Sequence, residues 1–330
     1  MKPFAIAGIQ MFVSAVHENL TRFCQKVDTL MHVHPWIQMV LTSELAVHGP
    51  LIRNVEPPDG PTERRLRQLA AHHGIWLIPG SLFQQEGDKV YNVAPVIAPD
   101  GGLVGRYRKM FPFTPYEQGV EPGTEFMLFD VPQVGRFGVS ICYDMWFPET
   151  IRTLAAMGAE VILHPSLTNT IDRELELVIS RAAAIQNQCY FFDINGAGDG
   201  GNGRSTIIGP AGDVFYTAGT TEENMPVEID LARVRRSREF GLRGLGQVLK
   251  SFRDRRVDFK VYDRASGVAA YLDTLGPLEK PVRGSRIGLE SRDLPATTGA
   301  AQYAPSPEEV IMKTPLASPE GPLLKGDGKE

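Results

Sequence analysis

The sequence has few cysteines, and their spacing indicates neither a disulfide pair nor a paired metal-binding motif. Cys24, Cys142 and Cys189 are an odd number, stand far apart and form no CxxC motif. A disulfide framework or a cysteine-rich zinc site needs an even set or closely spaced thiols, so this pattern excludes both and favours a reducing compartment. We therefore expect a cytoplasmic protein without a structural metal, in which at least one thiol is free to react.

Long apolar runs and an excess of one charge are also lacking. No window approaches the roughly eighteen apolar residues that a membrane span needs, and the opening MKPFAIAGIQMF has neither a long apolar core nor a small-residue cleavage site. The 34 basic and 39 acidic residues give a formal charge of -5 and are mixed along the chain, so no basic stripe exists for a phosphate backbone. We expect neither a membrane nor a nucleic acid as a partner.

What the chain does have is a large apolar content arranged in short runs. Of its 330 residues 42% are hydrophobic, enough for a substantial core. Runs typical of buried strands alternate with stretches in which apolar residues recur three and four apart, as in helices. The predicted strands are PFAIAGIQM, WIQMVLTSEL, IWLIPGSLF, NVAPVIAP, RFGVSICYD, AEVILHPSL and QCYFFDINGAG, and the predicted helices span 18–32, 62–73, 148–157 and 172–188.

This alternation predicts an α/β fold, and two segments predict hairpins within it. Residues 92–107 and 204–216 resemble antiparallel pairs around Asp100-Gly101-Gly102 and Pro210-Ala211-Gly212-Asp213. The sheet should therefore be mixed. From about Leu275 the chain becomes rich in Pro, Gly, Ser and Thr, so we expect one domain over 1–265 and an extension over 266–330 that is partly disordered or wraps a partner subunit. The arginine-rich segment 239–262 has apolar residues at helical spacing and favours a subunit contact.

Three residues at predicted strand ends are candidates for chemistry. Cys142 follows the apolar run VSI, Glu44 lies near the end of MVLTSEL, and Lys109 follows the alternating GRYR. A reactive thiol needs a proton acceptor and a positive neighbour. His164, in LHPS at another strand end, is an alternative partner for Cys142, although no Asn or Asp stands beside it to complete a Cys-His site.

Taken together, these blocks resemble the nitrilase superfamily of carbon-nitrogen hydrolases. LTSEL, VYNVAPVIAPDGGLVGRYRKMFPF and VSICYDMWFPE occur in that family's order, supported by HPSLTN, RAAAIQNQCYFFDINGAG and GRSTIIGPAGDVF. The resemblance runs from about Ala5 to Asp230. It implies a nitrilase-type α-β-β-α four-layer sandwich that pairs into αββα-αββα dimers, with no metal and no organic cofactor.

The resemblance also implies roles for the strand-end residues. Cys142 would attack a carbonyl as a thiolate that Lys109 favours, with Glu44 as the proton acceptor and a thioester as intermediate. Glu117 would be a second glutamate that positions substrate, with Glu121 as the competing choice. The expected substrate-binding residues are Tyr143, Tyr116, Trp146, His164 and Asn169.

Within the family, the triplet Cys142-Tyr143-Asp144 favours hydrolysis of a small-molecule amide to a carboxylic acid and ammonia. Two other reactions stay open: hydrolysis of N-carbamoyl compounds, with Arg173 or Arg204 binding a substrate carboxylate, and hydrolysis of nitriles. A catalytically silent subunit that only binds or assembles is the alternative outside enzymes. In each case we expect a homo-oligomer, at least a dimer.

Overall fold

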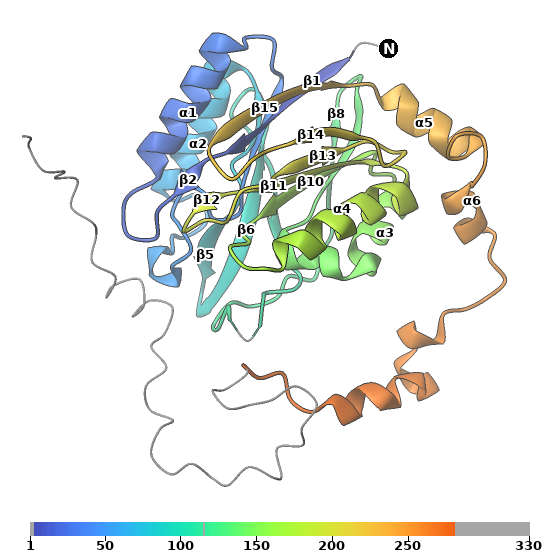
Figure 1. Ribbon diagram of the computed structural model, residues 1–330. Coiled ribbons are helices and arrows are strands. Elements are labelled where there is room, and N and C mark those ends of the chain that lie inside the picture. Colours follow the sequence, from blue (N-terminus) through green and yellow to red (C-terminus); the bar gives the residue numbers. More distant parts are fainter. Residues whose placement is uncertain (1–2, 115, 281–330) are drawn as a thin grey trace, which may run out of the picture. The chain divides into compact units, whose positions relative to one another are not determined.

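The computed structural model describes residues 3–114 and 116–280, which form one compact unit (Figure 1). The predicted domain boundary after residue 265 falls among short 3-10 turns: η3 (Lys260–Tyr262), η4 (Arg264–Ser266) and η5 (Val268–Leu275). Residues 281–330 of the expected extension lie outside the described residues. The boundary and the wrapping of a partner therefore stay predictions.

Two mixed sheets form the centre of the unit. The first has the strand order β15-β1-β3-β4-β6-β5, with β7 paired to β6, and the second has the order β14-β13-β11-β10-β9-β8. The first sheet comprises β1 (Phe4–Gln10), β3 (Met39–Thr42), β4 (Trp76–Ile78), β5 (Leu82–Glu86), β6 (Lys89–Ile97), β7 (Leu103–Arg108) and β15 (Glu223–Ile229). The second comprises β8 (Met127–Val131), β9 (Gly135–Val139), β10 (Val161–Ser166), β11 (Tyr190–Asn195), β13 (Thr206–Ile208) and β14 (Val214–Thr217).

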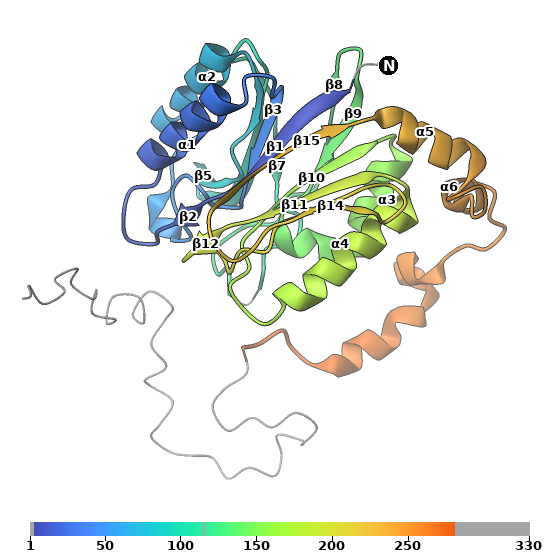
Figure 2. The same ribbon diagram turned by 45° about the horizontal axis from the view of Figure 1, so that its top comes forward.

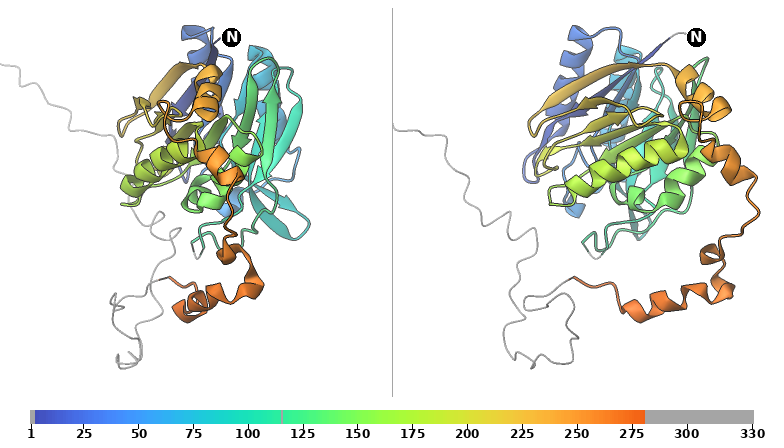
Figure 3. Two further views of the ribbon diagram at one scale, coloured as in Figure 1. Left: turned by 90° about the vertical axis from the view of Figure 1, so that its right-hand side faces the viewer. Right: turned by 45° about the vertical axis from the view of Figure 1, so that its right-hand side comes forward.

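Helices cover the outer face of each sheet, so the layers run α-β-β-α (Figure 2). Helices α1 (Leu20–Val33) and α2 (Pro61–His73) pack on the first sheet. Helices α3 (Pro148–Ala156) and α4 (Arg173–Asn187) pack on the second, where they lie side by side (Figure 3). The remaining elements are the small pair β2 (Phe12–Val13) and β12 (Ala197–Gly198), and α5 (Leu231–Phe240), α6 (Val248–Arg253), η1 (Ile52–Asn54) and η2 (Cys142–Trp146). No helix in the described part of the chain is both long and apolar enough to cross a membrane.

The four layers follow from the alternation of side chains along the strands. In β1, Phe4 and Ile6 pack between the two sheets, while Ala5, Ala7 and Ile9 face α1 and α2. Successive side chains of a strand point to opposite faces. Because both faces are covered, both sets are apolar, which is why β1 reads as a continuous apolar run.

The predicted helices agree closely with α1, α2, α3 and α4, and the predicted hairpins correspond to β6–β7 and β13–β14, which are antiparallel. Several elements were not predicted, among them β8, β15 and α5. β15 contains Pro226 and two glutamates, and it pairs antiparallel with β1 at the edge of the first sheet, where a missing N–H is tolerated. Helix α5 carries many arginines and few apolar residues, so its sequence shows only a weak helical periodicity of apolar positions.

The carboxyl ends of β3 and β10 meet across the two sheets. The Glu44 N–H, just after β3, donates to the Ser166 carbonyl at the end of β10 (3.2 Å). Gly80 packs closely against the backbone just before Glu44. It has φ +77°, and a Cβ there would lie 1.7 Å from the Ser43 carbonyl oxygen. Only glycine allows the backbone to pass so close to the residue before Glu44.

This close approach predicts the effect of a side chain at Gly80. Gly87, in the β5–β6 turn, also has positive φ (+64°), but a Cβ at that position would have nothing within 4 Å. Gly87→Ala should cost about 1 to 2 kcal/mol of unfolding free energy from the left-handed backbone alone. Gly80→Ala should cost more, about 3 kcal/mol or above, because backbone must also move. Urea unfolding of both variants measures the difference, and equal losses would contradict this account.

Candidate active site

A buried ion cluster joins the predicted residues of the first sheet. The Lys109 ammonium, just after β7, donates to Glu44 Oε1 (2.8 Å) and to Glu117 Oε2 (2.7 Å). Asn92 on β6 donates its side-chain amide to Glu44 Oε1 (2.8 Å) and to Glu117 Oε1 (3.2 Å). Glu44, Lys109 and Asn92 are all buried. The two carboxylates are thus held together by one cation and one amide.

The charge states of this cluster follow from burial and neighbours. Burial opposes the charge of Lys109, but Glu117 and Glu44 outweigh it and raise the pKa of the ammonium well above its ordinary value. Burial also opposes the charge of Glu117, yet Lys109 and the N–H of Phe113 (2.5 Å) hold its pKa below the ordinary value. Burial raises the pKa of Glu44, with Lys109 opposing the shift. Of the three, Glu44 is the group most ready to accept a proton.

Cys142 comes from the second sheet, as the first residue of η2 after β9. It has φ +45°, rare for a residue with a side chain, so the turn holds it under strain. Its thiol lies 3.7 Å from the Leu167 carbonyl. Burial, followed by the Glu44 charge, raises the thiol pKa well above its ordinary value despite Lys109. The shift favours the neutral form of the Cys142 thiol, because the one nearby ammonium already contacts two carboxylates.

Asp144 fixes the nucleophile turn. Its carboxylate accepts the N–H of Ile141 (2.8 Å), the hydroxyl of Tyr107 (2.7 Å) and the N–H of Phe111 (2.9 Å). Burial raises its pKa to about 6. Tyr107 and Phe111 flank Lys109 in the chain. Asp144 therefore ties the turn that carries Cys142 to the segment that carries Lys109.

His164 lies within the second sheet and has no exposed surface. Its Nδ1 is 2.7 Å from the Ser140 hydroxyl, two residues before Cys142, and its Nε2 has no hydrogen-bond partner among the described residues. Burial and then the charge of Arg173 lower the pKa of the imidazole to about 3. A neutral, enclosed imidazole supports the nucleophile turn from behind, and does not present a wall to substrate as expected from the sequence.

The other expected binding residues are spread around the nucleophile. Tyr143 packs edge-on against Phe113 (4.9 Å between ring centroids), and Phe113 stacks on Tyr116 (4.8 Å). Trp146 lies 6.2 Å from Tyr143 and packs partly against the α3–α4 core. Tyr116 is half exposed. Asn169 is exposed in the loop after β10.

Arg173 is committed to a buried network. Its guanidinium contacts Asp193 (2.9 Å) and Glu176 (3.1 Å) and donates to the Arg204 carbonyl (2.8 Å). Glu176 in turn accepts the Thr168 hydroxyl (2.9 Å). The network braces the segment that follows β10. Arg173 is fully buried and therefore not free to bind a substrate carboxylate, whereas the Arg204 side chain forms an exposed ion pair with Glu174.

Asn92, Ser140 and the Arg173 network were not predicted from the sequence. For Asn92 a signal existed, since it is a polar residue within the run VYNVAPV, and its carbonyl accepts the N–H of Lys109 (2.9 Å). A fully buried amide in a strand needs partners. The partners themselves could not be read from one strand, because they arrive from the loops that hold Glu44 and Glu117.

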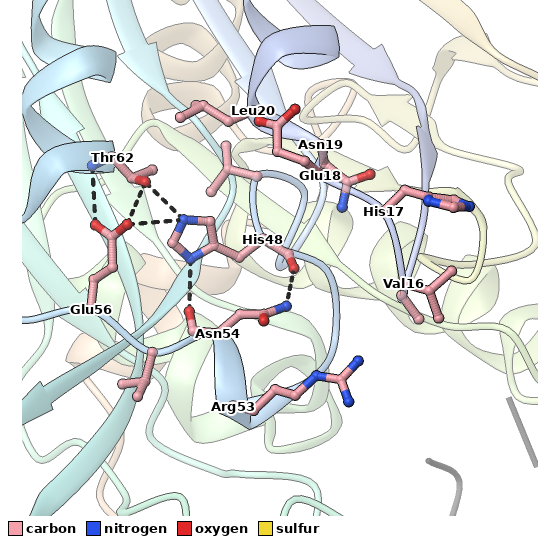
Figure 4. A pocket seen from close by; sticks show the side chains of 13 residues that line it. Val16, His17, Glu18, Asn19, Leu20, His48, Arg53, Asn54, Glu56 and Thr62 are labelled. Carbon is pink, nitrogen blue, oxygen red and sulfur yellow. Dashed lines mark hydrogen bonds and ion pairs between the residues drawn. The ribbon is translucent and has the colours of Figure 1, made fainter. Parts of the chain in front are cut away.

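A separate pocket of about 460 Å³ lies beyond Glu44, around His48. Figure 4 shows that the polar side chains on one side of it bind one another: His48 contacts the Asn54 carbonyl and the Thr62 hydroxyl (both 2.8 Å), and Glu56 accepts from Thr62 (2.7 Å). These bonds tie the loop after Glu44 to α2. Among the described residues, no group of three or more His, Cys, Asp or Glu is arranged to hold a metal ion.

The low pKa of His164 predicts how stability changes with pH. The unfolded imidazole takes up a proton near its ordinary pKa of 6.5, while the folded one does so only near 3, so falling pH favours the unfolded state in this window. Relative to His164→Gln, the wild type should lose about 1.4 kcal/mol of unfolding free energy per pH unit below 6.5. Above pH 6.5 the difference should be constant. Urea unfolding of both proteins at several pH values tests this, and a difference that stays constant throughout would contradict a neutral His164.

Comparison with known proteins gives the same fold and family. The carbon-nitrogen hydrolase family pattern matches residues 32–239. Omega-amidase NIT2 of Homo sapiens is 30% identical over 277 residues, which cover 78% of this chain and 97% of that protein. A nitrilase of Pyrococcus abyssi is 34% identical over 214 residues, 61% of this chain and 75% of that protein.

Solved structures agree. Nit3 of Saccharomyces cerevisiae, a member of branch 10 of the nitrilase superfamily, superposes with a TM-score of 0.67 and 26% identity, covering 72% of this chain and 94% of that one. The amidase of Nesterenkonia sp. AN1 superposes with a TM-score of 0.64 and 23% identity, covering 77% of this chain and 96% of that one, a likeness of fold. This chain belongs to the carbon-nitrogen hydrolase family and has the αββα fold of the nitrilase superfamily.

Proposed function

We propose that the chain hydrolyses linear amides to a carboxylic acid and ammonia, through a thioester on Cys142. The observation that carries this proposal is the Lys109 ammonium held between Glu44 and Glu117, the two carboxylates that would serve as base and as substrate anchor. The similarity to omega-amidase NIT2 supports amides as the substrate class.

In the first half of the reaction, Cys142 Sγ forms a bond to the amide carbonyl carbon while its proton moves to Glu44. Because the thiol pKa is raised, this transfer accompanies attack and is general-base catalysis. The carbonyl electrons move to oxygen, where the Lys109 ammonium and the backbone N–H of Tyr143 stabilise the charge. Glu44 then returns the proton to nitrogen, the C–N bond breaks, and ammonia leaves.

In the second half, Glu44 takes a proton from water, whose oxygen attacks the thioester carbon. The C–S bond breaks, the acid leaves, and the proton returns to Cys142. Lys109 stays charged throughout, because its pKa lies well above neutral. Activity should therefore rise with pH as Glu44 ionises, at a pH above the ordinary carboxyl value.

Glu117 has the charge and position to hold the substrate nitrogen. Its lowered pKa keeps it ionised, so it accepts hydrogen bonds, and the N–H₂ group of an amide offers two. Nitriles lack these donors. The N-carbamoyl alternative loses one of its two candidate arginines, since Arg173 is buried against Asp193, while Arg204 forms an exposed pair with Glu174. Nitrile hydrolysis stays an outcome to test, given the resemblance to the Pyrococcus abyssi nitrilase.

We also propose that the protein acts in the cytoplasm as a homo-oligomer of at least two subunits. Its three cysteines are unpaired and buried, which supports a reducing compartment. Ile171, Leu175 and Val178 are exposed at spacings of four and three residues, and form an apolar stripe that begins just before α4 and continues along it. Such a stripe is suited to bury against a second copy.

The proposed reaction is tested by incubating wild type and Cys142→Ala with short aliphatic, aromatic and ω-carboxy amides, N-carbamoyl compounds and matching nitriles. Ammonia should appear from amides, and the variant should lose activity by several orders of magnitude because the nucleophile is gone. Intact-mass analysis of quenched wild type should find the acyl group on Cys142. Ammonia from nitriles alone, or turnover that survives in Cys142→Ala, would refute the proposal.

The choice of second glutamate has a matched control within one loop. Glu117→Gln removes the negative charge beside Lys109 and should lower kcat/KM for amides roughly 100- to 1000-fold. Glu121 is exposed, and its backbone N–H is engaged with the Val90 carbonyl. Glu121→Gln should leave kcat/KM within about twofold of wild type. The reverse order of effects would assign the role to Glu121.

A further inference from the structure

A second pocket, of about 430 Å³, lies on the outer side of the second sheet. It is bordered by the first two turns of α3, the end of α4, and the segment from α6 to η3. Its volume is within the range of small-molecule sites. The lining residues are Pro148, Glu149, Arg152, Thr153, Gln186, Asn187, Phe252, Phe259 and Tyr262, and include none of the proposed catalytic residues.

The walls combine an aromatic surface with a cation that lacks a counter-ion. Phe252 and Phe259 stack with ring centroids 6.2 Å apart, and the Arg152 guanidinium lies 5.2 Å from the Phe252 centroid. Within the described residues Arg152 makes no hydrogen bond or ion pair, and its Nη1 is buried. Partial burial lowers the pKa of Arg152, because no carboxylate compensates its charge.

The carboxylate in the lining does not fill this role. Glu149 Oε1 accepts the hydroxyl of Tyr262 (2.9 Å) instead. Arg255 adds a further positive charge at the rim of the aromatic pair, 4.3 Å from the Phe252 centroid, although it does not line the pocket. Of the two charged side chains that line the pocket, Glu149 and Arg152, only Arg152 thus lacks a polar partner within the described residues. A singly charged anion would supply one.

An unpaired acceptor completes the wall. Asn187, at the end of α4, is 3% exposed, and its side-chain N–H₂ donates to the Ala183 carbonyl (2.9 Å), which fixes the orientation of the amide. Its Oδ1 has no partner among the described residues. A buried acceptor without a donor is costly. The pocket thus offers one cation and one acceptor beside an apolar surface.

We propose that this pocket binds a small monocarboxylic acid with an apolar or aromatic body and a hydrogen-bond donor. The carboxylate pairs with Arg152, the donor reaches Asn187 Oδ1, and the body packs on Phe252 and Phe259. Arg152 and Asn187 both gain the partner that the described part of the chain does not supply. In the pocket around His48, by contrast, the half-buried His48 and Glu56 already share Thr62 as a partner (Figure 4).

The pocket also borders the helix that begins behind the nucleophile. Pro148 and Glu149 open α3, and the next residue, Thr150, donates its hydroxyl to the Asp144 carbonyl (2.7 Å). Asp144 is the residue that holds the Cys142 turn. A ligand on α3 should therefore change kcat. This effect rests on the proposed amide hydrolysis, whose product is itself a carboxylic acid, whereas the binding does not.

The experiment is calorimetric titration of the full chain, as Cys142→Ala, with 4-hydroxyphenylacetate. We expect a Kd of roughly 0.1 to 1 mM for a ligand of this size. 4-Hydroxyphenylethanol, which lacks the carboxylate, should bind at least about tenfold more weakly, as should acetate, which lacks the ring. Absence of heat up to several times that Kd would overturn the proposal.

Variants assign the site. Arg152→Met should weaken binding about tenfold or more, and Phe259→Ala should weaken it by packing loss in a protein whose Arg152 is intact. The matched control is Arg255→Met, which also removes a guanidinium from the Phe252 ring and should retain binding within about threefold. Circular dichroism verifies that each variant is folded.

Two outcomes separate this inference from the proposed function. If Arg152→Met and Phe259→Ala bind as well as Cys142→Ala alone, while Lys109→Met does not, the acid occupies the catalytic site and the inference is wrong. If binding depends on Arg152 but the wild type releases no ammonia from any amide, the acid site stands and the proposed reaction fails.

Discussion

The geometry of the candidate site depends on one buried ammonium, Lys109, that lies between two carboxylates. Lys109 would be costly to bury alone, and so would either glutamate, since each isolated charge loses its hydration. Together they compensate, with Asn92 donating to both acids. Removing one partner of such a cluster typically costs about 3 to 5 kcal/mol. The strand ends and loops around it are therefore fixed by electrostatics as well as by apolar packing.

The same cluster explains the state of the nucleophile. Burial, together with the carboxylates already beside the single cation, raises the pKa of the Cys142 thiol, so in the proposed reaction its proton moves to Glu44 as the sulfur attacks. Asp144 and His164 contribute by geometry: one ties the turn to the segment carrying Lys109, the other supports it from within the sheet. Neither needs to change charge for the proposed reaction.

Much of the fold was readable because local patterns agreed with one another. Apolar runs gave the central strands and periodicity gave four helices, while the family resemblance singled out Glu44, Lys109 and Cys142 among the candidates at predicted strand ends. What could not be read depends on contacts between distant segments. The choice of Glu117 over Glu121 as the partner of Lys109 needs the path of a loop, and the neutral state of His164 needs its complete burial. β15 was not predicted because an edge strand tolerates proline and charged residues and so need not form an apolar run.

Glu44, Lys109 and Asn92 belong to the first sheet, whereas Cys142 and its supports belong to the second. The apolar layer between the sheets, which includes Phe4 and Ile6, is what brings the two halves together. A chain in which only one sheet has formed holds either a proton acceptor without a nucleophile or a thiol without its acceptor. The proposed site is therefore complete only when the two sheets have packed against each other. The apolar core between the sheets is thus a requirement of the proposed chemistry as well as of the fold.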